Sequence, residues 1–337
     1  MRVNHRVRLV DATGGRMGVG VDATASQAGD AAERKWSGGR RRWEDDAVPT
    51  FEAARGDYEF VDSFGVTIAY YAWKVGKPRG VVQIVHGVGE WALRYEPLAQ
   101  VLVNAGYSVY ANDHRGHGRT GIGQWGEGSG RLGRLGEGGF DAAMAAVRQL
   151  TGILRDENPG VPVIGLGHSL GSLMMQIAIN DHADDFDAAV LTGTAYRTPR
   201  SMNGGDLNKR HAHLGTTGFE WLSRDPAVAE AMASDPRAVE ATVLKLFGLQ
   251  DALKLFGRPA KHLARDLPLL IQVGSDDTLG GTASAEKLAH AYLNRSHLSD
   301  VELIVYDGAR HEVFNETNRD EVMSDLVGWL DARFGAA

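Results

Sequence analysis

One serine of this chain has a glycine two positions before it and another two positions after it. It is Ser169, in the stretch VIGLGHSLGS that runs from residue 163 to residue 172. The apolar start of this stretch predicts a buried strand, and a helical pattern follows the serine. A serine at such a strand–turn–helix junction is typical of a nucleophile elbow, where Gly167 and Gly171 leave room for a tight turn. We therefore expect Ser169 to be a nucleophile.

A serine nucleophile needs a general base, and the base needs an acid that orients it. In folds with a nucleophile elbow, the acid and then the base follow the serine along the chain. The stretch LLIQVGSDDT ends an apolar run in Asp276 and Asp277, and VYDGARHE ends the next run in His311. We assign Asp277 as the acid in preference to Asp276. His311 is the only histidine beyond the last predicted strand, and we assign it as the base.

The oxygen of an attacked carbonyl becomes negative, so the reaction also needs hydrogen-bond donors that stabilise an oxyanion. The backbone N–H of Leu170, the residue after the nucleophile, is expected to be one donor. The other is expected after an early strand, where the stretch VHGVGEW brings the N–H of Val88 to the site. His86 in this stretch is interpreted as a hydrogen-bonded support of the loop rather than as a proton carrier.

Apolar runs and helical patterns alternate along the chain from about residue 58 onward. Strands are predicted at 65–75, 80–87, 108–114, 161–168, 188–195, 268–277 and 301–311, and helices at 94–106, 140–160, 170–183, 283–294 and 316–334. This alternation predicts an α/β fold, in which a mainly parallel sheet carries helices on both faces. A glycine-rich stretch at 115–139 is predicted to be a loop.

The alternation stops between residues 196 and 266, an interval too long for a plain loop. Helical patterns at 225–233 and 235–248 predict an inserted helical cap over the edge of the sheet where ligands bind. Residues 57–195 and 267–337 then form the core of the fold. Residues 1–56 are expected to be a disordered or weakly ordered extension, with a targeting or partner-binding arm as the alternative.

The composition is that of a globular protein, with 43% hydrophobic and 23% charged residues among 337. The formal net charge of -7 argues against nucleic acid as a partner, because phosphate binding favours a basic surface. The absence of cysteine excludes disulfides and thiolate chemistry, and it is compatible with the cytoplasmic location that we expect. No apolar run approaches the length of a membrane span. Nothing in the sequence indicates an oligomeric state.

Five motifs in a fixed order make the chain similar to the α/β-hydrolases of the monoacylglycerol lipase and lysophospholipase type, which are grouped with serine aminopeptidases. They are HGVGEWALRY at 86–95, NDHRGHGRT at 112–120, GHSLG at 167–171, GSDD at 274–277 and GARHEVFNE at 308–316. The stretch FEWLSRD at 219–225 in the predicted cap is also similar. The sequence departs from the pattern at Trp91, where many members have histidine.

The resemblance implies an α/β-hydrolase fold and cleavage of carboxylic esters through an acyl-enzyme on Ser169. It implies a small acyl ester or a lipid as the substrate, and neither a metal nor another cofactor. Four residues of the similar motifs are expected to contact the substrate: Gly87, Trp91, His168 and Trp221.

Several alternatives stay open at this point. A peptidase or amidase of the same superfamily would need acidic cap residues, such as Asp206 and Glu220, to bind a free amino terminus. A non-catalytic ligand-binding protein could have the same fold. The apolar cap face within residues 239–247 is interpreted as packing, with an acyl-chain channel or a transient membrane contact as the alternative. The pair His211 and His213 has no evident third ligand, so no metal site is expected there.

Overall fold

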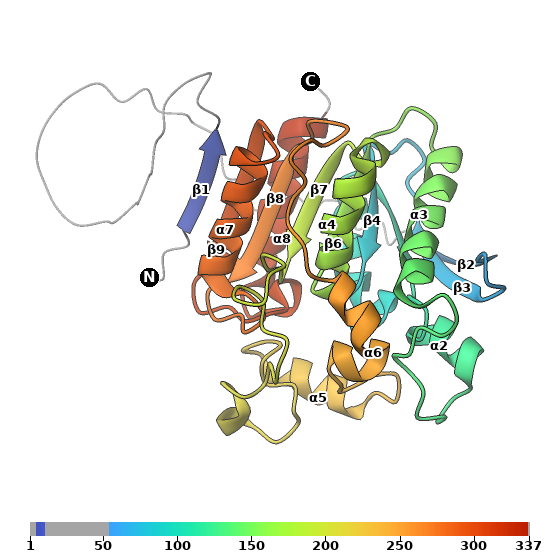
Figure 1. Cartoon of the computed structure of the whole chain (residues 1–337). Helices are drawn as coiled ribbons and strands as arrows, with labels where there is room; N and C mark the ends of the chain where they lie inside the picture. The colour runs from blue at the N-terminus through green and yellow to red at the C-terminus, as the bar shows by residue number, and fades with distance from the viewer. Residues whose placement is uncertain (1–4, 11–53, 336–337) are drawn as a thin grey trace, which may run out of the picture.

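The computed structural model describes residues 5–10 and 54–335, and residues 5–10 are described by their backbone alone. The described residues form a nine-stranded sheet with the order β1-β9-β8-β7-β6-β4-β5-β3-β2 (Figure 1). The strands are β1 (His5–Val10), β2 (Arg55–Val61), β3 (Thr67–Trp73), β4 (Gly80–Val85), β5 (Tyr107–Asn112), β6 (Val163–His168), β7 (Ala188–Thr192), β8 (Leu269–Gly274) and β9 (Asp300–Tyr306). The strands from β5 to β9 along this order are parallel, and β1, β2 and β3 are antiparallel to their neighbours. The predicted α/β fold with a mainly parallel sheet is confirmed.

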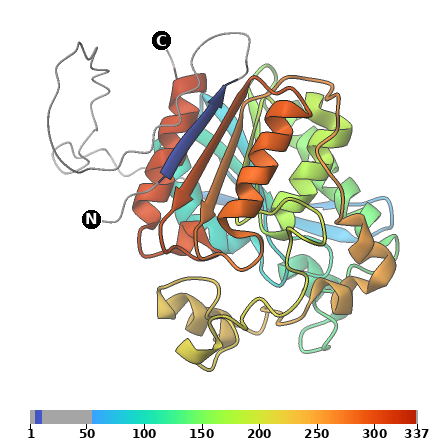
Figure 2. The ribbon, with the colours of Figure 1, turned by 60° about the vertical axis from the view of Figure 1, so that its left-hand side comes forward.

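Helices cover both faces of this sheet, as the sequence predicts. They are α1 (Glu96–Asn104), α2 (Gly118–Trp125), α3 (Gly139–Glu157), α4 (Leu170–His182), α5 (Pro226–Ser234), α6 (Val243–Lys254), α7 (Gly281–Asn294) and α8 (Arg319–Phe334), with short 3-10 helices η1 (Ala92–Tyr95), η2 (Ala183–Asp185), η3 (Ala212–Leu214) and η4 (Val313–Asn315). Buried residues of α3, α4 and α7 pack on one face of the sheet, and those of α1 and α8 pack on the other. Figure 2 shows α7 and α8 on opposite sides of the sheet.

The central strands explain why the fold needs two helical layers. β4, β6, β7 and β8 are buried along their whole length. Successive residues point to opposite faces, so that Val163 belongs to the core beneath α3, α4 and α7, whereas Ile164 belongs to the core beneath α1 and α8. Because these strands are parallel, their carboxyl ends lie at one edge of the sheet. Ser169, Asp277 and His311 all follow strands that end at this edge.

Between β7 and β8 the chain leaves the sheet, and we call residues 196–266 the cap segment. In Figure 1, its helices α5 and α6 lie beyond one edge of the sheet. Asp225 accepts the N–H of Ala227 and begins α5, and Thr242 accepts the N–H of Lys245 and begins α6. No helix of the described residues is long and apolar enough to cross a membrane.

Three local predictions differ from the structure. The helix expected at 235–248 is confirmed only in its second part, because residues 235–242 are not helical and α6 extends from Val243 to Lys254. The glycine-rich stretch 115–139 contains α2, and β2 precedes the first predicted strand. Most of the extension expected at 1–56 lies outside the described residues, but His5–Val10 form β1, which pairs with β9.

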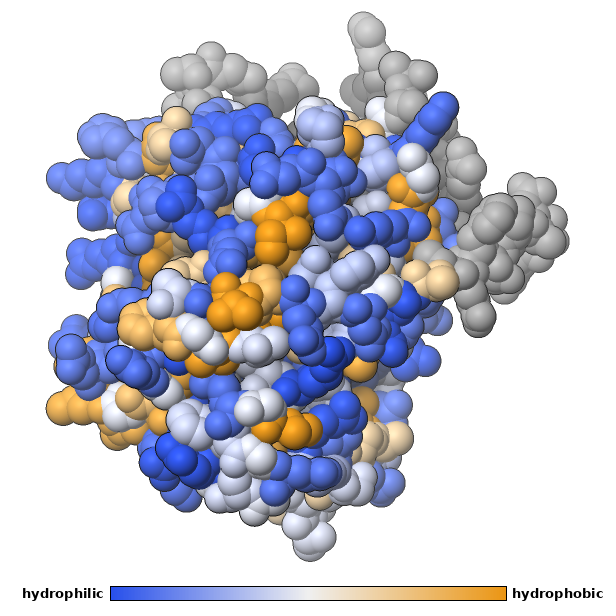
Figure 3. All heavy atoms as spheres, turned by 90° about the vertical axis from the view of Figure 1, so that its right-hand side faces the viewer, coloured by the Kyte–Doolittle hydropathy of each residue, from blue (hydrophilic) through white to orange (hydrophobic). Residues whose placement is uncertain are grey.

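Large apolar side chains are exposed in two regions of the described surface. Tyr58, Val61 and Phe64 lie on and beside the edge strand β2, and Leu214, Leu244, Leu249 and Leu253 lie on the cap segment. On the face that Figure 3 shows, hydrophobic patches are separated by hydrophilic side chains. The leucines of the cap segment matter below because three of them border a cavity.

Candidate active site

Ser169 occupies a strained turn between β6 and α4. Its φ of +53° lies in the left-handed region, which residues other than glycine rarely adopt. A Cβ atom at Gly171 would collide with the carbonyl oxygen of Val85, and one at Gly167 would collide with the carbonyl oxygen of Gly171. The two glycines therefore allow α4 to start against the neighbouring strand. The geometry is that of the predicted nucleophile elbow.

His311 and Asp277 form a buried pair behind this turn. Nδ1 of His311 lies 2.9 Å from Oδ1 of Asp277, which also accepts the N–H of Leu279 at 2.8 Å. A proton donated from Nδ1 to the carboxylate leaves Nε2 as the basic nitrogen of the ring. This Nε2 is buried and has no hydrogen-bond partner in the described chain. Burial acts to lower the pKa of His311, but the charge and hydrogen bond of Asp277 outweigh it, so the pKa is raised.

Asp276, the other candidate acid, points to the cap segment instead. Its Oδ2 lies 2.8 Å from Nε2 of His211, and its Oδ1 lies 2.7 Å from a guanidinium nitrogen of Arg210. The two neighbouring carboxylates therefore have different partners. The geometry favours Asp277 over Asp276 as the partner of His311.

The two expected oxyanion donors border the same cavity as Ser169. Val88 and Leu170 both line it, and their N–H groups take no part in the backbone hydrogen bonds of turns and loops in the described chain. The first four N–H groups of a helix have no partner within the helix, which leaves that of Leu170 available. A hydrogen bond within the loop that carries Val88 stabilises its conformation, because Glu90 accepts the N–H of Gly87 at 2.5 Å.

A buried ion-pair cluster next to the cavity was not predicted from the sequence. Arg94 donates to Glu90 at 2.7 Å and to both oxygens of Glu312, at 2.5 and 2.7 Å. Burial raises the pKa of Glu90. Burial also acts to raise the pKa of Glu312, but the charge of Arg94 outweighs it and lowers that pKa to about 2. All three residues stand in motifs quoted above, at 86–95 and 308–316, yet their types and spacing alone do not show that they meet.

Histidines near the site are held neutral by burial. Burial lowers the pKa of His168 to about 3 and that of His114 to about 3, and it lowers the pKa of His86 well below its ordinary value. Nε2 of His86 accepts the N–H of His114 at 2.9 Å, and its Nδ1 lies 2.7 Å from the carbonyl oxygen of Gly87. These bonds agree with the interpretation of His86 as a support of the loop.

A cavity of about 540 Å³ opens over Ser169 and is large enough for a small ligand. Three of the four expected substrate contacts, Gly87, His168 and Trp221, line it together with His311. The indole of Trp221 lies with its ring centre 4.5 Å from that of His311. Much of the remaining wall is apolar: Leu170, Leu173, Met202, Leu207, Phe219, Leu222, Met232, Val239, Val243, Leu244, Leu249, Leu253, Leu255, Phe256 and Leu279.

Trp91 lies elsewhere, so the structure does not support it as a substrate contact. It is 6% exposed and packs against Phe219, Leu222 and Met232 of the cap segment, outside the cavity lining. The guanidinium of Arg237 lies 4.2 Å from the centre of the indole. Trp91 therefore joins the loop after β4 to the cap segment.

No cluster of three or more histidine, aspartate and glutamate side chains able to hold a metal is present in the described residues. His211 bonds to Asp276, and His213 is an exposed residue of η3.

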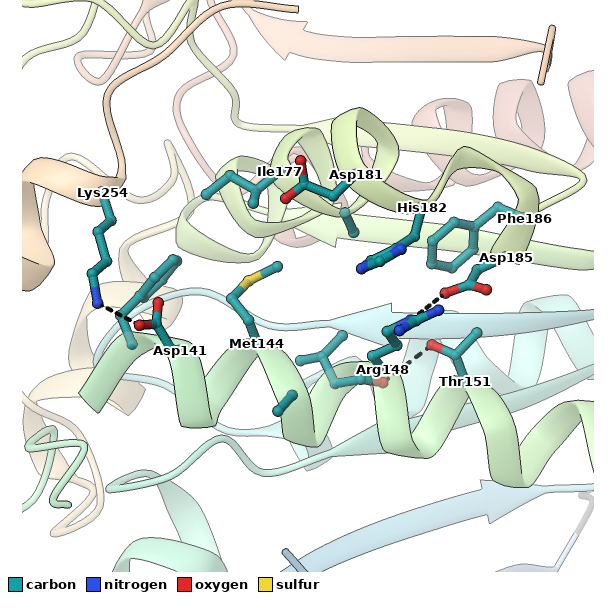
Figure 4. A pocket seen from close by; sticks show the side chains of 14 residues that line it. Asp141, Met144, Arg148, Thr151, Ile177, Asp181, His182, Asp185, Phe186 and Lys254 are labelled. Carbon is teal, nitrogen blue, oxygen red and sulfur yellow. Dashed lines mark hydrogen bonds and ion pairs between the residues drawn. The ribbon is translucent and has the colours of Figure 1, made fainter. Parts of the chain in front are cut away.

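A second hollow, of about 390 Å³, lies between α3 and α4 (Figure 4). Met144 and Ile177 contribute to its apolar floor. Lys254 pairs with Asp141 at one end, and Arg148 pairs with Asp185 at the other. Ser169, Asp277 and His311 do not line this hollow, and we assign it no part in the chemistry.

Comparison with known proteins gives a consistent result. Residues 76–318 match the family described as "Serine aminopeptidase, S33". A monoacylglycerol lipase of Mycolicibacterium smegmatis is 32% identical over 82% of this chain and 98% of that protein, and a monoglyceride lipase of Rattus norvegicus is 28% identical over 79% and 87%. A lipase solved in an open form has a TM-score of 0.67 and 27% identity, covering 84% of this chain and 100% of the other. A carboxyl esterase of Bacillus coagulans shares the fold, with a TM-score of 0.68 at 23% identity, over 83% of this chain and 99% of that one.

Proposed function

The chain belongs to the serine aminopeptidase family of α/β-hydrolases, and we propose that it is a serine hydrolase of carboxylic esters, of the monoacylglycerol lipase type. One observation carries the proposal. Ser169 in its strained turn and His311, which is paired with the buried Asp277, border one cavity whose wall is largely apolar. This arrangement suits an ester with an acyl chain.

In the proposed mechanism, the hydroxyl of Ser169 attacks the ester carbonyl while Nε2 of His311 takes its proton. Asp277 orients the imidazole and stabilises the imidazolium that forms. The N–H groups of Val88 and Leu170 hold the developing oxyanion. The alcohol then leaves with the proton from His311, and an acyl ester on Ser169 remains.

The second half of the reaction uses the same groups. His311 takes a proton from a water molecule, which attacks the acyl ester on Ser169. The oxyanion forms again next to Val88 and Leu170. When it collapses, Ser169 recovers its proton from His311 and the carboxylic acid is released, so the enzyme returns to its starting state without a cofactor.

We propose that the cap segment selects the substrate. Its residues supply most of the apolar wall, which suits an acyl chain of medium or long length. Residues Asn203, Asp206 and Asn208 line the cavity as well and provide polar groups for a small head group. An exchange of residues 196–266 for the cap of a relative is expected to change the preferred chain length, and an unchanged preference would contradict this role.

We also propose that the cap segment touches lipid surfaces transiently. Leu244, Leu249 and Leu253 of α6 are exposed by 54%, 66% and 55%, and all three border the cavity. Exposed leucines at the entrance would allow a lipid substrate to pass from an aggregate into the cavity with little contact with water. The lack of cysteine is compatible with the reducing cytoplasm, which we propose as the location.

The peptidase alternative is less well supported. The carboxylate of Glu220 accepts hydrogen bonds from Thr217 and Asn208, at 2.6 Å each, and it does not line the cavity. Of the two acidic residues named for this role, Asp206 lines the cavity, as does one further acidic residue of the cap segment, Glu240.

The function is tested by rates on p-nitrophenyl esters from acetate to palmitate, measured beside aminoacyl p-nitroanilides. We expect turnover of esters with an optimum at medium or long chains, and at least a hundredfold lower kcat/KM for the anilides. Faster cleavage of anilides would favour the peptidase, and no turnover of either class would favour the non-catalytic alternative.

A further inference from the structure

A continuous series of polar contacts joins the loop after β4 to the loop after β9. One oxygen of Glu90 accepts the N–H of Gly87 at 2.5 Å, and the other accepts Nη1 of Arg94 at 2.7 Å. The same guanidinium donates to both oxygens of Glu312, at 2.5 and 2.7 Å. Such a bidentate pair fixes orientation as well as distance, because the guanidinium fork and the carboxylate are both planar.

Both ends of this series belong to the proposed reaction machinery. Gly87 directly precedes the oxyanion donor Val88, and Glu312 directly follows the base His311. Arg94 and Glu312 are 218 residues apart in the sequence, so only the fold brings the two loops together. A loss of the contact between them would free each loop to move relative to the other.

The series also places a net negative charge beside the base. Glu90 and Glu312 are each 4% exposed, and the single cation between them is Arg94. Every hydrogen bond that the Glu90 carboxylate makes in the described chain comes from a donor: the N–H of Gly87, Nη1 of Arg94 and the hydroxyl of Tyr95. These donors favour the ionised form of Glu90, whereas burial raises its pKa. With both carboxylates ionised, the two carboxylates and one guanidinium sum to a charge of about −1.

We propose that Glu312 is a positioning residue for the hydrolysis, which acts on the oxyanion loop through Arg94 and on His311 through its charge. This inference rests on the proposed function. When His311 takes the proton of Ser169, the negative charges of Asp277 and Glu312 both stabilise the imidazolium. Through Arg94, the carboxylate of Glu312 fixes the position of the loop that carries His311 relative to the loop that carries Val88.

Several charged or titratable groups near His311 can affect its pKa, and a pH experiment must separate their effects. Asp277 acts on His311 from the loop after β8, and Glu90 from the connection after β4. His168 at the end of β6 lies with its ring centre 4.8 Å from that of His311, and Glu312 is the next residue of the chain. His168 stays neutral near pH 7, because burial lowers its pKa to about 3. The charges that act on His311 in this range are therefore those of Asp277 and of the cluster that contains Glu312.

The test compares Glu312→Gln with the wild-type enzyme on p-nitrophenyl butyrate across a pH series. Glutamine has the size of glutamate but loses its charge and the bidentate contact with Arg94. We expect kcat/KM to fall by roughly tenfold to a hundredfold, because the loops of His311 and Val88 are no longer fixed relative to each other. We also expect the acidic limb of the kcat/KM profile to move to lower pH by roughly one unit, since loss of a negative charge lowers the pKa of His311.

Two further variants separate charge and position from general stability. Glu312→Asp keeps the charge but shortens the side chain, so kcat should fall while the acidic limb stays at its wild-type pH. Glu316→Gln is a matched control, because Glu316 is a buried carboxylate of the same segment that pairs with Arg224 at 2.8 Å instead of Arg94. It should lower the thermal melting temperature without moving the acidic limb.

The inference is overturned if folded Glu312→Gln has kcat/KM within twofold of wild type and an unshifted limb. It is also overturned if Glu316→Gln moves the limb as far as Glu312→Gln does, because the effect is then a general loss of structure. If Glu312→Gln does not fold, the test rests on Glu312→Asp. A shift of the acidic limb of its kcat/KM profile to lower pH would then contradict the charge effect. A wild-type enzyme without esterase activity, or an active Ser169→Ala variant, would contradict the proposed function itself.

Discussion

The carbonyl oxygen of Gly89 accepts the backbone N–H of Val239 at 3.1 Å, and this bond attaches the loop of the expected oxyanion donor to the cap segment. The approach is close, because a Cβ atom at Gly89 would collide with the carbonyl oxygen of Val239. Gly89 also has a φ of +77°, a conformation that glycine adopts readily. The cap segment and the loop that carries Val88 are therefore directly connected.

Replacement of Gly89 by alanine should break this connection. The new methyl group must displace residue 239 or the loop itself, so we expect kcat/KM on p-nitrophenyl butyrate to fall by roughly tenfold to a hundredfold. Gly65→Ala is the matched control. Gly65 has a similar φ of +75° but no atom within 4 Å of the added methyl group. It should lose about 1–2 kcal/mol of stability with little change in activity. Equal activity in the two variants would contradict a role for the contact.

The same substitution should have effects of very different size at the two neighbouring aspartates. Asp277→Asn should lower kcat by about 10⁴-fold, because His311 loses the partner that fixes its tautomer. Asp276→Asn removes only the contacts with Arg210 and His211, so it should change kcat by less than about tenfold. Steady-state rates of the two purified variants decide the assignment. A larger loss in Asp276→Asn would reverse it.

The pH dependence of the reaction should report His311. Only the neutral imidazole accepts a proton from Ser169, so kcat/KM should rise with pH through the pKa of His311 in the free enzyme. That pKa is raised by Asp277, so the midpoint should lie above the ordinary value of about 6.5. In Asp277→Asn the midpoint should move to lower pH. A wild-type midpoint well below 6.5 would show that burial outweighs the carboxylate.

The exposed leucines of α6 should matter for aggregated substrate and not for dissolved substrate. The double variant Leu249→Asn and Leu253→Asn removes about 2 kcal/mol of apolar contact with a lipid surface, so the rate on emulsified long-chain monoacylglycerol should fall by about thirtyfold. The rate on dissolved p-nitrophenyl butyrate should stay within about twofold. Leu214→Asn is the control, since Leu214 is 52% exposed on the cap segment but does not line the cavity. Equal loss on both substrates would place the effect inside the cavity.

Local patterns in the sequence predicted those features that depend on neighbouring residues. The apolar run before Ser169 forms β6, and the glycines around it relieve collisions that any strand–helix turn of this kind would have. The strand ends at Asp277 and His311 follow from the same alternation. The parallel sheet, the helices on both its faces and the family were therefore accessible from the residues alone.

Features that depend on contacts between distant segments were not accessible. The apolar pattern of residues 235–248 has helical spacing, yet residues 235–242 are not helical. Val239 bonds to Gly89 instead, and α6 starts later, after the N-cap residue Thr242. Trp91 was expected to contact the substrate but is covered by the cap segment. The pairing of Arg94 with Glu312 spans most of the chain, and no spacing rule connects them.

The proposed mechanism depends most directly on an acyl-enzyme at Ser169. A fluorophosphonate ester forms a stable bond with an activated serine hydroxyl and releases fluoride, so intact-mass and peptide mass spectrometry can locate the adduct. We predict one adduct per wild-type chain, on the peptide that contains Ser169, with loss of esterase activity in proportion to labelling. We predict no adduct in Ser169→Ala. An adduct on another residue, or an unlabelled wild-type enzyme that still hydrolyses esters, would contradict the account.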